Sequence, residues 1–231
     1  MADQKVAVIT GASKGIGRAC AKLFLEKGYI VVDASRSNPH PFDDKNFTHI
    51  KTDISQEESI KNLYEEVKNR FGRTDVLINN AGYGIFKKLA DTTTEDFDKI
   101  YAVNVRGLYI CTRYFIKLML EQNSGTIINI ASLAGKNGFN EGTLYCGTKH
   151  AVMGISKSLM LEVRGNNIRV IVVCPGSVDT EFFDVAHVEV NNDPKTFLTS
   201  EDIASACLLA AELPPNALMN EIELRPANPH K

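Results

Sequence analysis

Tyr145 and Lys149 are the two side chains whose types and spacing point most directly to chemistry. They lie four residues apart in a segment, 143–164, whose pattern of apolar residues predicts a helix. Side chains four residues apart lie on one face of a helix, one turn apart. An ammonium beside a phenol favours the phenolate, so we expect Lys149 to lower the pKa of Tyr145. Such a pair suits a general acid/base; the alternative is a half-buried tyrosine beside a solvated lysine.

Short apolar runs alternate with helical patterns along the chain, and this alternation indicates the elements that position the pair. Continuous β-branched runs are typical of strands covered on both faces. We therefore predict an α/β fold over residues 1–231, a single domain with a Rossmann-type doubly wound parallel sheet of about seven strands. The expected strands are 6–10, 29–34, 48–51, 75–79, 126–131, 169–174 and 221–224. The expected helices are 15–27, 56–71, 95–121, 143–164 and 200–213, and the Pro-rich loop 35–46 is expected to cross directly between strands.

The composition narrows the class of protein. A net charge of −2 without a basic block gives no indication of nucleic-acid or anionic-membrane binding, and no apolar run reaches the roughly 18 residues of a membrane span. The residues after Met1 lead directly into a strand, so we expect a cytoplasmic protein without a signal peptide. The cysteines are odd in number and scattered, which favours reduced, buried thiols over a disulfide frame or a metal site: Cys20, Cys111, Cys146, Cys174 and Cys207.

A glycine-rich segment joins the first predicted strand to the first predicted helix: Thr10-Gly-Ala-Ser-Lys-Gly-Ile-Gly17. Glycines let the backbone turn tightly and approach a pyrophosphate, which the helix N-terminus then stabilises. The position between a strand and a helix favours this interpretation over a purely structural turn. The expected cofactor contacts in this loop are Gly11, Ser13, Lys14, Gly15, Ile16 and Gly17.

Taken together, six motifs resemble the short-chain dehydrogenase/reductase family in order and spacing. Besides the glycine segment they are Asn79-Asn-Ala-Gly82, Asn104, Ser132, the Tyr145/Lys149 pair, and Pro175-Gly176 followed by Val178 and Thr180. Ser132 precedes Tyr145 by the thirteen residues usual in the family, and the likeness runs from about Lys5 to Leu224. The resemblance implies a dinucleotide-dependent oxidoreductase. It also assigns cofactor contacts to Tyr145, Lys149, Asp53, Ile54, Asn80, Ala81, Gly82, Pro175, Gly176, Val178 and Thr180.

The resemblance implies a role for each of the four catalytic candidates. Tyr145 would donate its proton to a carbonyl oxygen as hydride arrives from the reduced nicotinamide, and Ser132 would hydrogen-bond that oxygen. Lys149 would hold the nicotinamide ribose, and Asn104 would support a water chain that reloads the proton. The alternatives are a strand-end hydroxyl that caps a turn for Ser132 and a side chain that bonds backbone for Asn104. For Asp53 the alternative is a helix N-cap, a role that also suits Ser55.

The end of the second strand bears on the choice of cofactor. Enzymes that select NAD commonly place an acid there, which binds the ribose 2′-OH and repels a 2′-phosphate. That position falls on Ser35 here, with Arg36 next to it, Lys14 in the glycine loop, and Asp33 two residues earlier on the same side of the strand. An uncharged hydroxyl near two cations suits a phosphate. We predict NADP(H) rather than NAD(H); the alternative is that both cations are solvated surface groups.

The substrate and the partners are less closely determined. We expect residues at about 180–199 to form a substrate lid. We also expect an apolar substrate pocket lined by Phe182, Phe183, Val185, Val188, Phe139, Leu133 and Phe86. The alternative is that these side chains cover the core or a subunit contact. The leading hypothesis is an NADPH-dependent carbonyl reductase of a small or medium ketone or aldehyde. The alternatives are a 3-oxoacyl-thioester reductase of lipid synthesis and a non-catalytic NADP-binding regulatory protein. Helices 95–121 and 143–164 carry surplus apolar residues, and with the family resemblance they suggest a homodimer or homotetramer.

Overall fold

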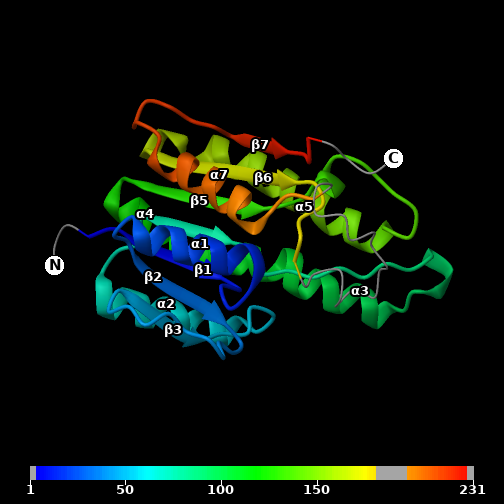
Figure 1. Ribbon diagram of the computed structural model, residues 1–231, viewed down its shortest axis with the longest axis horizontal. Helices are drawn as coiled ribbons and strands as arrows, with labels where there is room; N and C mark the ends of the chain where they lie inside the picture. The colour runs from blue at the N-terminus through cyan, green and yellow to red at the C-terminus, as the bar shows by residue number, and fades with distance from the viewer. Residues whose placement is uncertain (1–3, 181–196, 228–231) are drawn as a thin grey trace.

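The computed structural model describes residues 4–180 and 197–227, and its centre is one seven-stranded sheet (Figure 1). All neighbouring strands are parallel and follow the order β3-β2-β1-β4-β5-β6-β7. The order reverses between β1 and β4, where doubly wound sheets bind their ligands at the carboxyl ends of the strands. The strands are β1 (Val6–Thr10), β2 (Ile30–Ser35), β3 (Phe47–Lys51), β4 (Val76–Asn79), β5 (Gly125–Ile130), β6 (Ile168–Pro175) and β7 (Glu221–Leu224). The predicted fold class is confirmed.

Helices cover both faces of this sheet. The described α-helices are α1 (Gly15–Glu26), α2 (Glu57–Phe71), α3 (Thr94–Tyr101), α4 (Leu108–Gln122), α5 (Thr143–Val163) and α7 (Ser200–Glu212). Helices α1 and α7 cover one face, and α2, α4 and α5 cover the other. Successive strand residues alternate between the two faces: Ile9 packs in the core under α1 and α7, and Val8 packs in the core under α2, α4 and α5. Both faces are therefore apolar, which explains the continuous runs in the sequence.

The predicted helix 95–121 is interrupted. It begins at Thr94 with a capping box between Thr93 and Asp96, but Ala102–Gly107 is a π-helical segment that separates α3 from α4. A Cβ at Gly107 would lie 2.6 Å from the carbonyl oxygen of Ile54, so this turn lies directly against the loop after β3. Single π-turns inside α-helices are frequent at functional sites, and this one carries a catalytic candidate, Asn104.

Three smaller predictions can be compared with the described residues. The connection between β2 and β3 contains no helix, as expected from its prolines. All five cysteines are buried and free, as expected. Helix α1 ends at Glu26 instead of residue 27, and Gly28 follows with a φ of 82°, a left-handed conformation that glycine adopts without strain. Among the described helices, none combines the length and apolar character that crossing a bilayer requires.

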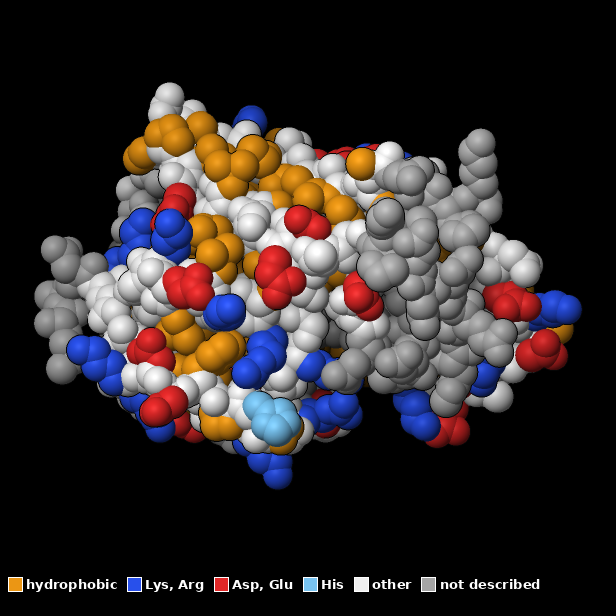
Figure 2. Space-filling view, in the orientation of Figure 1, with side chains coloured by type: hydrophobic (Ala, Val, Ile, Leu, Met, Phe, Trp, Pro, Cys, Tyr) orange, Lys and Arg blue, Asp and Glu red, His pale blue; other side chains and the backbone are white. Residues whose placement is uncertain are grey.

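The apolar residues cited for oligomerisation lie mostly inside the chain. Seven residues suggested such contacts: four are buried, two are partly buried and one is half exposed, namely Leu108, Phe115, Leu118 and Met153, then Leu159 and Met160, then Tyr109. Most of these positions are therefore not surplus, because α4 and α5 use them against the sheet, and the homodimer or homotetramer stays a prediction. On the face that Figure 2 shows, exposed apolar side chains gather on the α7–β7 side, which includes Leu209 and Leu218. Tyr109 and Leu120 of α4 and Leu161 of α5 are also exposed.

Candidate active site

The glycine loop forms a close-fitting turn between β1 and α1. Gly11 and Gly15 have φ angles of 69° and 55°, which disfavour any residue with a Cβ. A Cβ at Gly17 would lie 2.3 Å from the carbonyl oxygen of Gly11, so the backbone here has no room for a side chain. The side chain of Asn80, just after β4, donates from Nδ2 to the carbonyl oxygens of Thr10 (3.0 Å) and Gly11 (3.1 Å).

This turn has the properties that a dinucleotide pyrophosphate requires. Helix α1 starts directly after Lys14, and the N–H groups of the first turn of a helix point out of its N-terminus, here toward the loop. On the other side, the Thr180 methyl group lies 3.5 Å from the position of a Cβ at Gly15. The segment Pro175–Thr180 therefore runs beside the loop, and Gly176 is fixed by a bond from its N–H to the Leu224 carbonyl oxygen.

The structure brings the four catalytic candidates together at the carboxyl edge of the sheet. Tyr145 and Lys149 are buried on α5, with Lys149 Nζ 5.6 Å from the centre of the Tyr145 ring. Ser132 follows β5 and forms a side-chain hydrogen bond with Tyr145. A Cβ at Gly82 would lie 3.1 Å from Asn104 Oδ1 and 3.8 Å from Lys149 Nζ, which places these two side chains around one point.

Burial is the largest influence on the pKa values of Tyr145 and Lys149. Desolvation raises the pKa of Tyr145 above its ordinary value, and the hydrogen bond with Ser132 only partly opposes this. Burial also lowers the pKa of Lys149 to about 8, because a cation inside the protein loses its hydration. Lys149 Nζ donates to the carbonyl oxygen of Ile130 at 2.9 Å. The net shift of the Tyr145 pKa is therefore upward, opposite to the direction expected from the neighbouring Lys149, because burial dominates.

Asn104 uses its amide to join the π-helical segment to the loop after β4. Its Nδ2 donates to the Tyr83 carbonyl oxygen (2.9 Å) and to Thr148 Oγ1 (3.2 Å), and its Oδ1 accepts from the Tyr83 N–H (3.1 Å). This is the backbone-bonding alternative for Asn104. The contact with Thr148 also ties Asn104 to α5 between Tyr145 and Lys149.

The cofactor candidates at β2 and β3 lie at the same edge of the sheet. Arg36 and Lys14 are exposed, whereas Ser35 is buried and its hydroxyl donates to Asp33 Oδ2 at 2.9 Å. Asp53 Oδ1 accepts from the N–H of Ser55 at 2.9 Å and from its hydroxyl at 2.8 Å. Neither Asp53 nor Ser55 is the N-cap of α2, because that position is Gln56. Ile54 is buried against Gly107.

A buried polar network beneath the site did not emerge from the sequence. Asn79 Nδ2 donates to Thr112 Oγ1 of α4 (3.0 Å) and to Asn129 Oδ1 of β5 (2.8 Å). Asn129 Nδ2 in turn donates to Ser156 Oγ of α5 at 2.8 Å. The network fixes both helices to the sheet below the catalytic candidates. The available signal was an asparagine inside the otherwise apolar run Ile127–Ile130.

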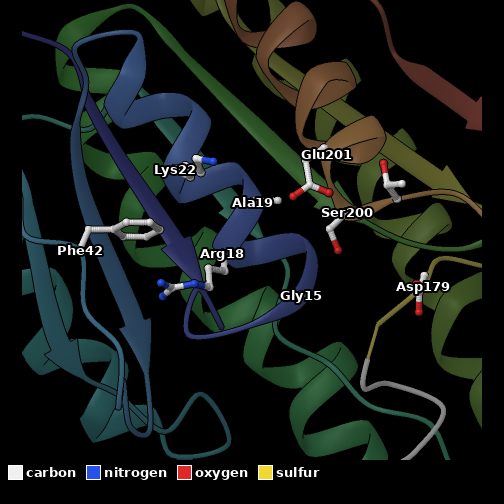
Figure 3. A pocket seen from close by; sticks show the side chains of 9 residues that line it. Gly15, Arg18, Ala19, Lys22, Phe42, Asp179, Ser200 and Glu201 are labelled. Atoms are coloured by element: carbon white, nitrogen blue, oxygen red, sulfur yellow. The ribbon is translucent and has the colours of Figure 1, made fainter.

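A separate open cavity of about 590 Å³ lies between α1, the start of α7 and the loop that carries Phe42 (Figure 3). Its lining includes Arg18, whose guanidinium lies 4.4 Å from the centre of the Phe42 ring, and Gly15 of the glycine loop. None of the four catalytic candidates lines it. The cavity therefore adjoins the glycine loop but is not the catalytic centre.

Comparison with known proteins decides the family. The family model for short chain dehydrogenase matches residues 5–189. This chain belongs to the short-chain dehydrogenase family. An uncharacterised oxidoreductase of Staphylococcus aureus (strain USA300) is 34% identical over 228 residues, which cover 96% of this chain and 97% of the relative.

Two solved structures show the same architecture. ElxO with NADP bound aligns with a TM-score of 0.87 at 31% identity, over 95% of this chain and 96% of ElxO. An alcohol dehydrogenase from the archaeon Thermococcus sibiricus, complexed with 5-hydroxy-NADP, aligns with a TM-score of 0.86 at 30% identity, over 99% and 100%. The resemblance drawn from the six motifs is thereby confirmed at the level of the family.

Aromatic side chains border Tyr145 in this short-chain dehydrogenase. The Phe86 ring lies edge-on to Tyr145 at 5.3 Å between centres and contacts the Phe139 ring at 5.7 Å. Phe139 is half exposed, and Leu133 is partly buried next to Ser132. Phe86 and Phe139 thus form an apolar wall beside Tyr145. Leu133 lies near Gly176, where a Cβ would be 3.4 Å from Leu133 Cδ1. The other four predicted pocket residues lie outside the described residues, namely Phe182, Phe183, Val185 and Val188.

Proposed function

We propose that this protein is an NADP(H)-dependent oxidoreductase that reduces the carbonyl of a small or medium, largely apolar ketone or aldehyde to an alcohol. The observation that carries the proposal is the hydrogen bond between Ser132 and Tyr145, beside Lys149 and the glycine loop. Two hydroxyls that share one bond can both turn to a carbonyl oxygen placed between them. The wall of Phe86 and Phe139 supports an apolar substrate.

The site residues have distinct roles in this reaction. NADPH, when bound, supplies the hydride. Ser132 orients the substrate oxygen, and Tyr145 donates its phenolic proton to that oxygen as negative charge develops on it. The phenol is protonated at neutral pH, since its pKa lies above the ordinary value of 10, and it therefore carries the proton that it donates. Lys149 is mostly charged below its pKa of about 8, so its ammonium stabilises the phenolate that forms.

The remaining site assignments belong to the same proposal. Asn104 supports the water chain that reloads the proton onto Tyr145. The contacts predicted from the six motifs hold the dinucleotide, with the pyrophosphate at Gly11–Gly17 and the 2′-phosphate near Lys14 and Arg36. NADP bound to ElxO and 5-hydroxy-NADP bound to the Thermococcus alcohol dehydrogenase support this choice of cofactor. The proposed substrate lid is residues 180–199, of which 181–196 lie outside the described residues. Among the described residues next to them, Val178 pairs with Leu198.

One panel assay tests the proposal. Purified protein is mixed with NADPH or NADH and a set of apolar ketones and aldehydes, with acetoacetyl thioesters as a separate arm. Loss of the reduced-nicotinamide absorbance is then followed. We expect turnover of free apolar carbonyls with NADPH in preference to NADH. Preference for thioesters would favour the acyl-thioester alternative, and NADPH binding without turnover of any carbonyl would favour the regulatory alternative.

A further inference from the structure

A buried carboxylate lies near the end of the second strand, where a negative charge would repel the 2′-phosphate of NADP(H). Asp33 is on β2, two residues before the strand ends at Ser35, and its side chain is 0% exposed. Its Oδ1 accepts from the backbone N–H of Ala12 at 3.1 Å, so the carboxylate is bonded directly to the glycine loop. Dinucleotide folds that select NAD commonly place an acid at the end of the second strand, which is Ser35 here, and Asp33 precedes it on the same side of the strand. A protein that uses NADP(H) has to reduce the effect of this charge.

Two further side chains cover the carboxylate. Ser35 Oγ lies 2.9 Å from Asp33 Oδ2 and also 3.0 Å from the Ser37 carbonyl oxygen, and its single hydrogen serves one of them at a time. Asn38 Nδ2, from the loop that joins β2 to β3, donates to the same Oδ2 at 2.8 Å. Asp33 and Ser35 are buried but Asn38 is only partly so, which makes Asn38 the outermost of the three groups.

No lysine or arginine in the described part of the chain pairs with Asp33. The nearest titratable partner is His49 on β3, whose Nδ1 lies 3.9 Å from Asp33 Oδ2. The negative charge of Asp33 is therefore balanced mainly by neutral donors. Hydrogen bonds to a carboxylate satisfy its lone pairs and stabilise it. The outermost donor also lies between the negative charge and a ligand that approaches from solvent, and its N–H dipole partly offsets that charge.

We propose that Asn38 is a specificity-determining residue that covers Asp33 and thereby permits a 2′-phosphate beside it. This inference rests on the proposed use of NADP(H). With Asn38 in place, Oδ2 cannot accept the ribose 2′-OH of NADH, and its charge is directed away from the 2′-phosphate of NADPH. Without Asn38, the carboxylate faces the ribose, gains an acceptor position for the hydroxyl and repels the phosphate.

The test measures binding of both cofactors by the fluorescence of the reduced nicotinamide, independently of turnover. Asn38→Ala should raise the Kd of NADPH relative to that of NADH by about tenfold, the scale of one partly screened like-charge contact. In the Asp33→Asn background, which removes the charge, the same substitution should change the ratio by less than about twofold. Asn46→Ala, in the same loop, is the matched control and should leave the ratio unchanged.

The outcomes separate this inference from the proposed function. A wild-type protein that binds NADH more tightly than NADPH would overturn the proposed cofactor. A wild-type preference for NADPH, with equal effects of Asn38→Ala on both cofactors, would overturn the role of Asn38 alone. A shift of equal size in the Asp33→Asn background would also overturn it, because the effect would then not pass through the carboxylate. Thermal melting of each variant shows that the fold is retained.

Discussion

Lys149 should make the protein more stable as the pH rises from 7 to 10. Its folded-state pKa of about 8 lies below the ordinary lysine value of 10.5, because burial disfavours the ammonium. Between these two values the unfolded chain holds a proton that the folded chain has released, so the free energy of unfolding increases with pH. The cost of burying the charge is present in full below pH 8 and disappears above 10.5.

The size of this effect follows from the two pKa values. Each tenfold change in proton affinity corresponds to about 1.4 kcal/mol, which gives about 2.5 kcal/mol of added stability between pH 7 and pH 10. Lys149→Met removes the titration. The stability of this variant minus that of the wild type should therefore fall by about that amount over the same range. Loss of the hydrogen bond to Ile130 shifts this difference equally at every pH and leaves its slope unchanged.

Urea unfolding at half-unit steps of pH measures the stability difference between Lys149→Met and the wild type. Groups that titrate equally in both proteins contribute equally to both stabilities and do not affect this difference. Lys157→Met provides the matched control, since Lys157 lies on the same helix but is exposed. That variant should follow the wild type at every pH. A constant stability difference between Lys149→Met and the wild type from pH 7 to 10 would refute the claim that burial lowers the pKa of Lys149.

Three further substitutions test other parts of the structure. Gly17→Ala places a methyl group against the Gly11 carbonyl and should weaken NADPH binding by about a hundredfold, measured by fluorescence titration; unchanged affinity would contradict the proposed pyrophosphate site. Gly154→Ala, on α5 with no atom within 4 Å of the new methyl, should instead stabilise the fold by about 0.5–1 kcal/mol in urea unfolding; a loss of stability would show that this helix face is not open. Asn129→Ala removes one of the buried hydrogen bonds of Asn79 and one of Ser156, and should lower the free energy of unfolding by about 2–3 kcal/mol. The exposed Asn137→Ala should stay within about 0.5 kcal/mol, and equal effects of the two asparagine variants would contradict a structural role for the network.

The layout of the sheet was predictable from the sequence because strand burial leaves a direct trace. Runs such as Val6–Thr10 are buried on both faces and therefore contain no alternating polar residues. The interruption at Ala102–Gly107 was not predictable, since a π-helical turn continues the apolar pattern of its neighbours. What distinguishes that segment is the contact between Gly107 and the loop after β3, which only the folded chain brings together.

The positions of the catalytic candidates were also predictable, but their electrostatics were not. The spacing of Tyr145 and Lys149 placed both on one helix face, whereas the sign of the Tyr145 pKa shift depends on how deeply the pair is buried. The same holds for Asp33, whose place on β2 is visible in the sequence. Its cover by Asn38 depends on the path of an irregular loop.

The central claim is that Tyr145 is the proton donor of a carbonyl reduction, and Tyr145→Phe tests it most directly. The substitution keeps the ring that contacts Phe86 and removes only the hydroxyl. With any carbonyl that the wild type reduces, we expect NADPH oxidation to fall by at least about a hundredfold, the scale of general acid catalysis. NADPH should still bind with a Kd within about twofold of the wild type. Turnover at the wild-type rate in this variant would contradict the account.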